Sequence, residues 1–364
     1  MKKSIRNIFV LAVLGFMGLP LFFFDSNRVA SEREKRKLAE YPFLLTDNRI
    51  NKNFFSEYDS YFQDHFGFRE QLIRFNEKIP LKIQKSIESR DAFSGKNGWY
   101  FINYDKNLKD FAKKNLLTAD ELKEFKKNIS NTMEWCKAQN IPCVFLICPN
   151  KHSVYPEFYP FERPDGITRA DQMTTVFDEL DANYIFPRDY ILLKKAYFDF
   201  PLYYETDTHW NPQGAYLASI LLREKIQKIF PDANFPKIEY ETKIDYSMTA
   251  GDILPMLGIS ESKSTQPILN PIGHDQSDFY IYLKNEGRDG VHTKGANPSL
   301  PRALIFRDSF FAALEPFVSP LFSEADYQWK QFDDSCKETV LSYKPDIIIF
   351  EAVERYAPSI CKCD

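Results

Sequence analysis

The sequence lacks the charge pattern of a nucleic-acid-binding protein. Its 47 Lys and Arg are outnumbered by 51 Asp and Glu, which leaves a formal net charge of -4. No basic tract with interleaved aromatic residues stands out. Because binding to a phosphate backbone depends on clustered positive charge, we expect no nucleic-acid partner.

The sequence also lacks the spacing of a metal site. Its six cysteines include no C-x2-C pair, and its five histidines form no cluster at ligand spacing. Structural zinc sites are typically built from such closely spaced pairs. We therefore predict neither a metal site nor a cofactor. A catalytic cysteine is not expected either, because none of the six has an evident partner that would activate its thiol.

A long apolar run occurs at the N-terminus. A basic start precedes an uncharged stretch from Ile8 to Phe24, about as long as a signal-peptide core or a short spanning helix. Both alternatives export the downstream chain, and the stretch Val29 to Ser31 is a poor cleavage site. We predict a signal anchor, or else a cleaved signal peptide, over residues 1–25, and a location in the periplasm or at the cell surface.

Export would permit disulfides. Cys136 ends a helical pattern and Cys143 begins a strand-like run, so these two could meet across a short connection. Cys336 could likewise reach Cys361 or Cys363 near the C-terminus. The sequence therefore predicts one or two disulfides without deciding the second pairing.

Residues 26–90 are predicted to form a helical segment next to the membrane. Aromatic residues recur at helical spacing between Asn53 and Ile83, and Gly67 interrupts the pattern. This arrangement favours two helices that lead from the membrane to the main domain.

Residues 91–364 alternate between strand and helix patterns. Turn residues followed by a β-rich run predict a strand or hairpin at residues 99–102, and short apolar runs typical of buried strands lie at residues 143–148, 184–186, 303–306 and 346–350. Helical patterns separate them, such as residues 118–136, where Thr118 and Glu121 have the spacing of a capping box. This order predicts an α/β domain whose mostly parallel sheet has helices on both faces. Residues 232–301 are polar and rich in Gly, Pro and Asn, and are predicted to be an elaboration outside the sheet core.

The stretch ETDTHWNPQG places an acid and a histidine side by side. Asn211 and Pro212 have the character of an N-cap and a first helical residue, so Asp207 and His209 fall in the turn before a helix. In an extended segment residues i and i+2 point to the same side. Asp207 could therefore accept a hydrogen bond from His209 Nδ1 and leave Nε2 to act as a general base.

The best nucleophile for this base lies about a hundred residues downstream. Ser309 follows the apolar strand pattern at residues 303–306 and precedes a resumed helical pattern. A serine at a strand-to-helix turn is presented at the carboxyl edge of the sheet, where backbone N–H groups can stabilise an oxyanion. The alternative is that Ser309 only caps the helix.

Two motifs carry a resemblance to a known family: DTHWNPQGA at Asp207–Ala215 and DSF at Asp308–Phe310. Supporting stretches are GWYF at Gly98–Phe101, PNKHSVYPE at Pro149–Glu157, GDILPMLG at Gly251–Gly258 and ERY at Glu354–Tyr356. On these residues the chain resembles the SGNH-hydrolase-like family of alginate and exopolysaccharide O-acetyltransferases. The likeness spans most of the chain after residue 25.

The resemblance implies a three-layer SGNH-hydrolase-like α/β domain with Ser309 as nucleophile, His209 as base and Asp207 as the orienting acid. The acid and base precede the serine, which reverses the usual order in SGNH esterases, but a triad is defined by geometry rather than order. Arg307 and Asp308 stand where those esterases have a Gly-Asp pair, which leaves the shape of the oxyanion turn open.

The resemblance also implies a reaction and partners. Ser309 would take an acetyl group from a membrane-bound O-acyltransferase and pass it to a hydroxyl of an exported polysaccharide. Side chains that could contact the substrate or an oxyanion are Asn150, Lys151, Trp210, Arg307 and Tyr356. Two alternatives stay open: a carbohydrate acetylesterase with the same triad, and a non-catalytic polysaccharide-binding protein.

Overall fold

The computed structural model describes residues 18, 22–26, 30–31, 36–46, 49–51, 53–68, 91–104, 106–249, 251–259, 263–286 and 290–363. The chain divides into two compact units, residues 1–86 and 87–364, and each is described by itself. Among the described residues, no helix has both the length and the apolar character needed to cross a bilayer. The predicted anchor over residues 1–25 lies almost wholly outside them.

The first unit contains one helix and two short strand pairs among its described residues. Helix α2 spans Phe54–His65, β1 (Ala30–Ser31) pairs with β2 (Arg36–Lys37), and β3 (Leu45–Thr46) pairs with β4 (Arg49–Ile50). Tyr61 and His65 form the buried side of α2, and Phe24 packs against both rings. The first of the two predicted helices is thus confirmed, and the second falls outside the described residues.

The second unit is built on a seven-stranded mixed sheet with the order β11-β12-β14-β13-β16-β7-β8. Its strands are β7 Cys143–Cys148, β8 Tyr184–Ile185, β11 Tyr280–Asn285, β12 Val291–Gly295, β13 Arg302–Phe306, β14 Glu324–Gln328 and β16 Ile347–Val353. The five strands from β14 to β8 run parallel, and β11 and β12 are antiparallel to their neighbours. The predicted α/β class is confirmed, whereas the sheet is mixed and not mostly parallel.

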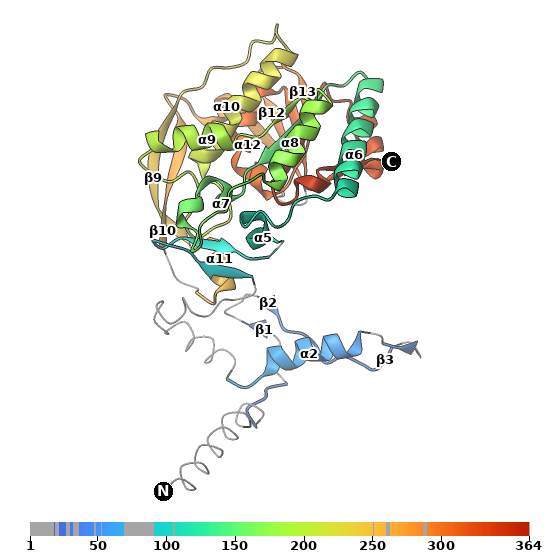
Figure 1. The fold of residues 1–364 in the computed structure, drawn as a ribbon, viewed down its shortest axis with the longest axis vertical. Coiled ribbons are helices and arrows are strands. Elements are labelled where there is room, and N and C mark those ends of the chain that lie inside the picture. Colours follow the sequence, from blue (N-terminus) through green and yellow to red (C-terminus); the bar gives the residue numbers. More distant parts are fainter. Residues whose placement is uncertain are drawn as a thin grey trace. The chain divides into compact units, whose positions relative to one another are not determined.

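Helices cover both faces of this sheet (Figure 1). Their bounds are α5 Asn107–Phe111, α6 Ala119–Ala138, α7 Lys151–Val154, α8 Arg169–Glu179, α9 Arg188–Lys194, α10 Pro212–Ile229, α11 Ile253–Met256, α12 Glu315–Val318 and α13 Lys337–Tyr343. Short 3-10 turns are η1 Pro156–Phe158, η2 Lys195–Tyr197, η3 Gln276–Asp278, η5 Ser309–Ala313, η6 Ser319–Leu321, η7 Asp334–Cys336 and η8 Ala357–Ser359. The starts of α6 and α10 agree with the predicted helix starts, and both predicted caps are present at Thr118 and Asn211.

The hydrophobic core lies in two layers, one on each face of the sheet. In β7, Val144 and Leu146 belong to the layer under α9, α10 and α12, whereas Phe145 and Ile147 belong to the layer under α6, α8 and α13. This alternation follows from the two-residue period of a strand. Burial on both faces explains why the central strands read as continuous apolar runs.

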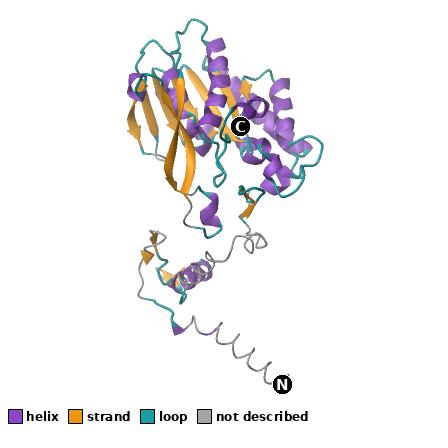
Figure 2. Cartoon of the chain, turned by 90° about the vertical axis from the view of Figure 1, so that its left-hand side faces the viewer, coloured by secondary structure: helices purple, strands orange, loops and turns teal. Residues whose placement is uncertain are grey.

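The stretch from 232 to 301 is only partly an elaboration. It holds the antiparallel hairpin of β9 (Tyr240–Thr249) and β10 (Lys263–Pro271), which stands out in Figure 2 and lies outside the main sheet. The prediction was wrong for β11 and β12, which extend the sheet at one edge. Strand β11 carries the apolar stretch Tyr280–Leu283 and is nevertheless exposed along most of its length.

Two small pairs complete the second unit. β5 (Ala92–Ser94) and β6 (Tyr100–Ile102) form an antiparallel hairpin, and β15 (Phe332–Asp333) pairs in parallel with β17 (Cys361–Lys362). The strand predicted at residues 99–102 is thus one arm of a hairpin.

The predicted disulfides are not formed. All six cysteines lie among the described residues and carry free thiols. The thiol of Cys336 contacts Gln331 O at 3.8 Å within its own turn, whereas the thiol of Cys361 contacts Asn128 O of α6 at 3.8 Å. The two sulfurs therefore face different acceptors. Cys136 does lie beside Cys143, and this contact together with burial raises the pKa of the Cys136 thiol.

Candidate active site

Three neighbouring parallel strands end at the same edge of the sheet. β13, β16 and β7 lie side by side, and each is followed by polar residues of the predicted site. Backbone groups hold these ends together: Glu354 N–H donates to Cys148 O at 2.7 Å, and Val353 N–H donates to Asp308 Oδ2 at 2.7 Å. In sheets of this kind ligands bind outside the carboxyl ends of the strands.

Ser309 opens the turn that follows β13. The side chain of Asp308, not that of Ser309, caps the 3-10 turn η5, because Asp308 Oδ1 accepts a 2.8 Å hydrogen bond from Phe310 N–H. The hydroxyl of Ser309 is therefore not needed as a cap. The same bond occupies the Phe310 N–H, one of the backbone donors expected near an oxyanion.

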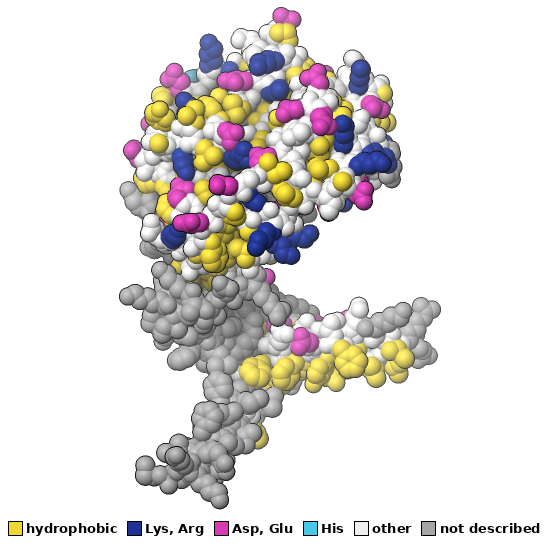
Figure 3. All heavy atoms as spheres, in the orientation of Figure 1, with side chains coloured by type: hydrophobic (Ala, Val, Ile, Leu, Met, Phe, Trp, Pro, Cys, Tyr) yellow, Lys and Arg dark blue, Asp and Glu magenta, His cyan; other side chains and the backbone are white. Residues whose placement is uncertain are grey.

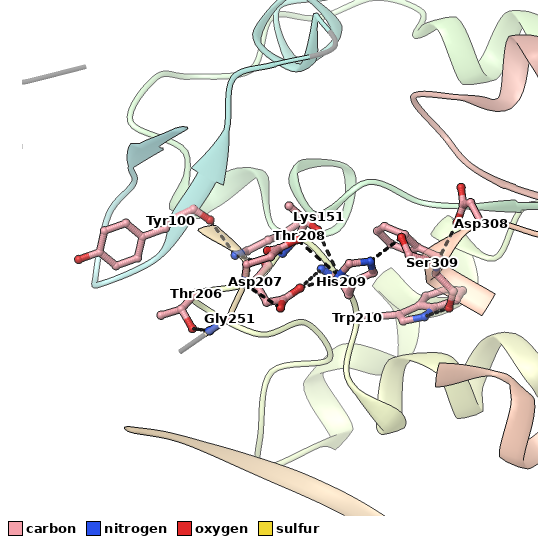
Figure 4. A network of polar contacts seen from close by, with 12 residues as sticks. Tyr100, Lys151, Thr206, Asp207, Thr208, His209, Trp210, Gly251, Asp308 and Ser309 are labelled. Atoms are coloured by element: carbon pink, nitrogen blue, oxygen red, sulfur yellow. Dashed lines mark hydrogen bonds and ion pairs between the residues drawn. The ribbon is translucent and has the colours of Figure 1, made fainter. Parts of the chain in front are cut away.

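Asp207, His209 and Ser309 form a continuous chain of hydrogen bonds (Figure 4). Asp207 Oδ1 lies 2.6 Å from His209 Nδ1, and His209 Nε2 lies 2.8 Å from Ser309 Oγ. Since an ionised carboxylate can only accept, Nδ1 carries the proton and Nε2 accepts from the serine hydroxyl. The predicted bond between Asp207 and His209 is confirmed, and the fold brings the distant serine to the other ring nitrogen.

The carboxylate of Asp207 is held in its ionised form. Burial raises its pKa, but the hydrogen bonds from the His209 side chain and backbone and from Asp252 N–H outweigh this effect and bring the pKa down to about 2. A permanent negative charge next to Nδ1 stabilises the imidazolium that forms when the ring takes a proton.

A second acid, Asp252, which the sequence patterns did not reveal as a site residue, braces the same turn. Asp252 Oδ1 accepts from Thr208 N–H at 2.7 Å, and Asp252 Oδ2 accepts from the Thr208 hydroxyl at 2.6 Å. Burial and the nearby Asp207 raise the pKa of Asp252. The stretch GDILPMLG contains this residue, but nothing local to it indicates a contact with residues about forty positions earlier.

Gly251 allows the two segments to meet. A Cβ placed on Gly251 would lie 2.4 Å from Asp207 Cβ and 2.7 Å from the Thr206 carbonyl oxygen. Both neighbours belong to the acid-bearing turn and cannot move away without displacing it. The glycine is thus required by the close approach to Asp207.

Trp210 ties the histidine segment to the serine segment. Its indole Nε1–H donates to Phe310 O at 2.9 Å, and the Phe310 ring packs 4.7 Å from the His209 ring. Trp210 is completely buried. It therefore offers no face to a sugar, and the predicted substrate contact at Trp210 is replaced by a structural one.

The other predicted substrate contacts differ in their surroundings. Arg307 is buried against the Trp329 ring at 4.3 Å, and the ammonium of Lys151 is enclosed by backbone carbonyls. Neither presents its charge to a bound polymer. Asn150 is buried, yet it lines a small cavity together with Thr208. Tyr356 is 37% exposed after the end of β16, so substrate contact at Asn150 and Tyr356 stays a prediction.

Asp207, His209 and Asp252 also form the one group of His, Cys, Asp and Glu among the described residues that could hold a metal ion. A cation there would need the Nδ1 lone pair of His209. That lone pair is absent while Nδ1–H donates to Asp207, so metal binding and the observed acid–base pair exclude one another.

Comparison with known proteins places the chain in a family. The sequence model described as "SGNH hydrolase-like domain, acetyltransferase AlgX" matches residues 92–278. The matched segment contains Asp207 and His209 and ends before Ser309. No curated protein matches the chain.

Several solved structures are similar. PatB1 from Bacillus cereus has a TM-score of 0.52 at 14% identity, covering 72% of this chain and 95% of that one. The O-acetyltransferase domain of Pseudomonas putida AlgJ has 0.49 at 16% identity, covering 75% of this chain and 94% of that one. AlgX from Pseudomonas aeruginosa has 0.46 at 16% identity, covering 72% of this chain and 61% of that one. The likeness to PatB1 shows a shared fold.

Proposed function

The chain belongs to the SGNH hydrolase-like acetyltransferase family of AlgX, whose model spans residues 92–278, and on that premise we propose that it transfers acetyl groups through an acyl intermediate on Ser309. The observation that carries the proposal is the unbroken chain from Asp207 through His209 to Ser309, with contacts of 2.6 and 2.8 Å. A nucleophile, a base in reach of it and a group that orients the base are the three parts that covalent acyl transfer needs.

In the first half-reaction, Ser309 Oγ attacks the carbonyl carbon of an acetyl donor while His209 Nε2 takes the hydroxyl proton. The tetrahedral intermediate then collapses, its bond to the leaving group breaks, and His209 returns the proton to that group. Asp207 keeps the ring in the required tautomer throughout, because its oxygen accepts from Nδ1–H at 2.6 Å. The product is an acetyl ester of Ser309.

In the second half-reaction, a hydroxyl of the acceptor gives its proton to His209 Nε2 and attacks the ester. Collapse of the second intermediate releases the acetylated acceptor and returns the proton to Ser309 Oγ. We propose that the acceptor is an exported or cell-surface polysaccharide, which is what the resemblance of the sequence motifs implies.

Asn150 is our candidate oxyanion donor. Its Oδ1 accepts a hydrogen bond from Arg355 Nη1 at 3.2 Å, which orients the amide so that Nδ2 faces away from Arg355. Nδ2 is buried and has no hydrogen-bond partner in the described part of the chain. A buried unpaired donor is costly unless a ligand satisfies it, and we propose that the developing oxyanion is that ligand.

Hydrolysis is the competing reaction. The side chains of His209 and Asp207 keep 25% and 21% of their surface exposed, so water can approach the same base that activates the acceptor. A carbohydrate acetylesterase is therefore the second candidate, and the fate of the acetyl group separates it from the transferase.

We also propose that the protein works outside the cytoplasm beside a membrane, with a membrane-bound O-acyltransferase as its acetyl source. The apolar run of residues 8–24 supports a signal anchor. In the first unit a row of hydrophobic side chains faces solvent along one edge (Figure 3). Phe43, Ile50 and Phe55 of this unit are 74%, 74% and 82% exposed. Exposed apolar patches of this kind mark interaction surfaces.

The test is direct acetylation by an activated acetyl ester such as 4-nitrophenyl acetate, followed by mass spectrometry of the peptide that contains Ser309. We expect one acetyl group on Ser309 in the wild type and none in Ser309→Ala. Ser299→Ala is the matched control, since Ser299 is an exposed loop serine. Adding polysaccharide should move the label to sugar, whereas quantitative release as free acetate would favour the esterase. A folded wild type without label on Ser309 would falsify both enzymatic candidates.

A further inference from the structure

The ammonium group of Lys151 is buried directly behind the acid–base turn. Lys151 begins α7, shortly after β7, and only 5% of its surface is exposed. Its Nζ donates to three backbone carbonyls, those of Tyr100 at 2.7 Å, Glu205 at 2.8 Å and Asp207 at 3.0 Å. Figure 4 shows Lys151 next to Asp207, on the side away from Ser309.

These contacts use the full hydrogen-bonding capacity of the side chain. A lysine ammonium has three N–H donors and no acceptor, and all three are taken by main-chain oxygens. The same group lies 5.0 Å from the ring centre of Trp99 and 5.1 Å from that of Phe101. The ammonium therefore has neither a donor nor an open face left for a substrate.

The three carbonyls come from two separate segments. One belongs to the β5–β6 hairpin, and the other two belong to the turn that carries Asp207 and His209. Tyr100 N–H also donates to Glu205 O at 2.9 Å, so hairpin and turn meet at the oxygen that Lys151 holds. Three carbonyl dipoles that converge in a buried place repel one another unless a cation lies between them.

We propose that Lys151 is a positioning residue, whose ammonium holds the backbone of residues 205–207 so that the Asp207 carboxylate stays within bonding distance of His209 Nδ1. Lys151 binds the backbone carbonyl of the acid. Asp252 holds the same turn from another side, because its carboxylate accepts from Thr208 N–H at 2.7 Å and its backbone N–H donates to Asp207 Oδ2 at 3.0 Å. The charged groups that face the ammonium are Asp207, Asp252 and Glu205. The catalytic part of this inference rests on the proposed function.

The experiment replaces Lys151 by Met in the full-length chain. Met is unbranched and only one atom shorter than Lys, so it can still pack against Trp99 and Phe101, but it supplies no donor. The matched control is Lys195→Met, because Lys195 also bonds a backbone carbonyl, Val154 O at 2.9 Å, and lies over an aromatic ring, that of Tyr155 at 4.8 Å. Both of these contacts lie outside the acid–base turn.

Two measurements are made on each variant. The first is the rate of Ser309 acetylation by 4-nitrophenyl acetate. In Lys151→Met we expect kcat to fall by about 100-fold, the loss that a displacement of about 1 Å can cause. We expect little change in KM. The second is the downfield proton NMR signal of His209 Nδ1–H, which reports the bond to Asp207 without any turnover. We expect this signal to be lost or shifted in Lys151→Met and unchanged in Lys195→Met.

The outcomes separate the two hypotheses. A folded Lys151→Met protein with the wild-type NMR signal and acetylation rate overturns the positioning role. A wild type that shows the NMR signal but no label on Ser309 overturns the proposed function, while the NMR comparison still decides the role of Lys151. If Lys151→Met does not fold, Lys151→Gln, which retains two N–H donors, takes its place, and an unaltered signal and rate in that variant refute the inference.

Discussion

Replacing Asp207 by Asn should uncouple the base from the nucleophile without changing the shape of the turn. All three partners of this carboxylate are N–H donors: His209 Nδ1 at 2.6 Å, His209 N at 2.9 Å and Asp252 N at 3.0 Å. An amide can offer its oxygen to only one side. Whichever side receives the NH2 group, one donor faces another donor.

Both orientations of the introduced amide impair the reaction. With NH2 toward His209, Nδ1 must become the acceptor and Nε2 the protonated nitrogen, so the ring cannot take the proton of Ser309. With oxygen toward His209, the tautomer survives, but the negative charge that stabilises the imidazolium is gone and NH2 faces Asp252 N–H. We expect acetylation of Ser309 to slow by about 1000-fold, which corresponds to about 4 kcal/mol in activation free energy. The free energy of unfolding should fall by about 1–3 kcal/mol through the unpaired donor.

Stopped-flow acylation with 4-nitrophenyl acetate and thermal unfolding test this prediction, with Asp189→Asn as the control because the Asp189 side chain is 81% exposed. Since the pKa of Asp207 is about 2, the carboxylate is ionised throughout a neutral pH series. The deficit of Asp207→Asn should therefore be similar across that series. A variant that acylates within a few fold of the wild type would show that Asp207 does not orient the base.

Three further outcomes are expected, two in the same region and one at a distant helix cap. Burial lowers the pKa of Lys151 to about 7, against the opposing effect of nearby acids. Raising the pH past that value removes one of the three N–H donors of Lys151, so the acylation rate of the wild type should fall at alkaline pH. The same fall should be absent in Lys151→Met. Gly251→Ala forces a methyl group to within 2.4 Å of Asp207 Cβ. The free energy of unfolding should therefore fall by about 1–3 kcal/mol, and the acylation rate should fall as well. A wild-type acylation rate would contradict this close contact. Thr118→Ala removes the capping box with Glu121 and should cost about 0.5–2 kcal/mol of unfolding free energy with acylation unchanged, whereas a slower acylation would show that α6 is coupled to the site.

Much of the site could be predicted from the sequence because its parts are local. Asp207 and His209 are two residues apart, and Asn211 and Pro212 mark the start of α10. Ser309 comes shortly after an apolar strand. Each of these signals depends on backbone geometry over a few residues, which a sequence displays without knowledge of the fold.

Other features could not be predicted because their cause lies elsewhere in the chain. From the sequence, Trp210 could either pack in the interior or stack on a sugar, and only the structure shows that it is buried and bonded to Phe310 O at 2.9 Å. The strand β12 lacks a continuous apolar pattern because only Val291 and Thr293 of its residues are buried. The cysteines are plausible partners by spacing, but the thiols of Cys336 and Cys361 contact different acceptors.

The sequence by itself thus determined the α/β class and the caps of the principal helices, since each is encoded by short-range periodicity or spacing. It was also sufficient to propose an acid, a base and a nucleophile. Only the tertiary structure decided that Ser309 Oγ lies 2.8 Å from His209 Nε2, one hundred residues away. It alone revealed the contacts of Lys151 and Asp252 behind the turn. The physical reason is that a buried ammonium or carboxylate is defined by the groups that converge on it, and here those groups come from segments that lie 44 to 56 residues away along the chain.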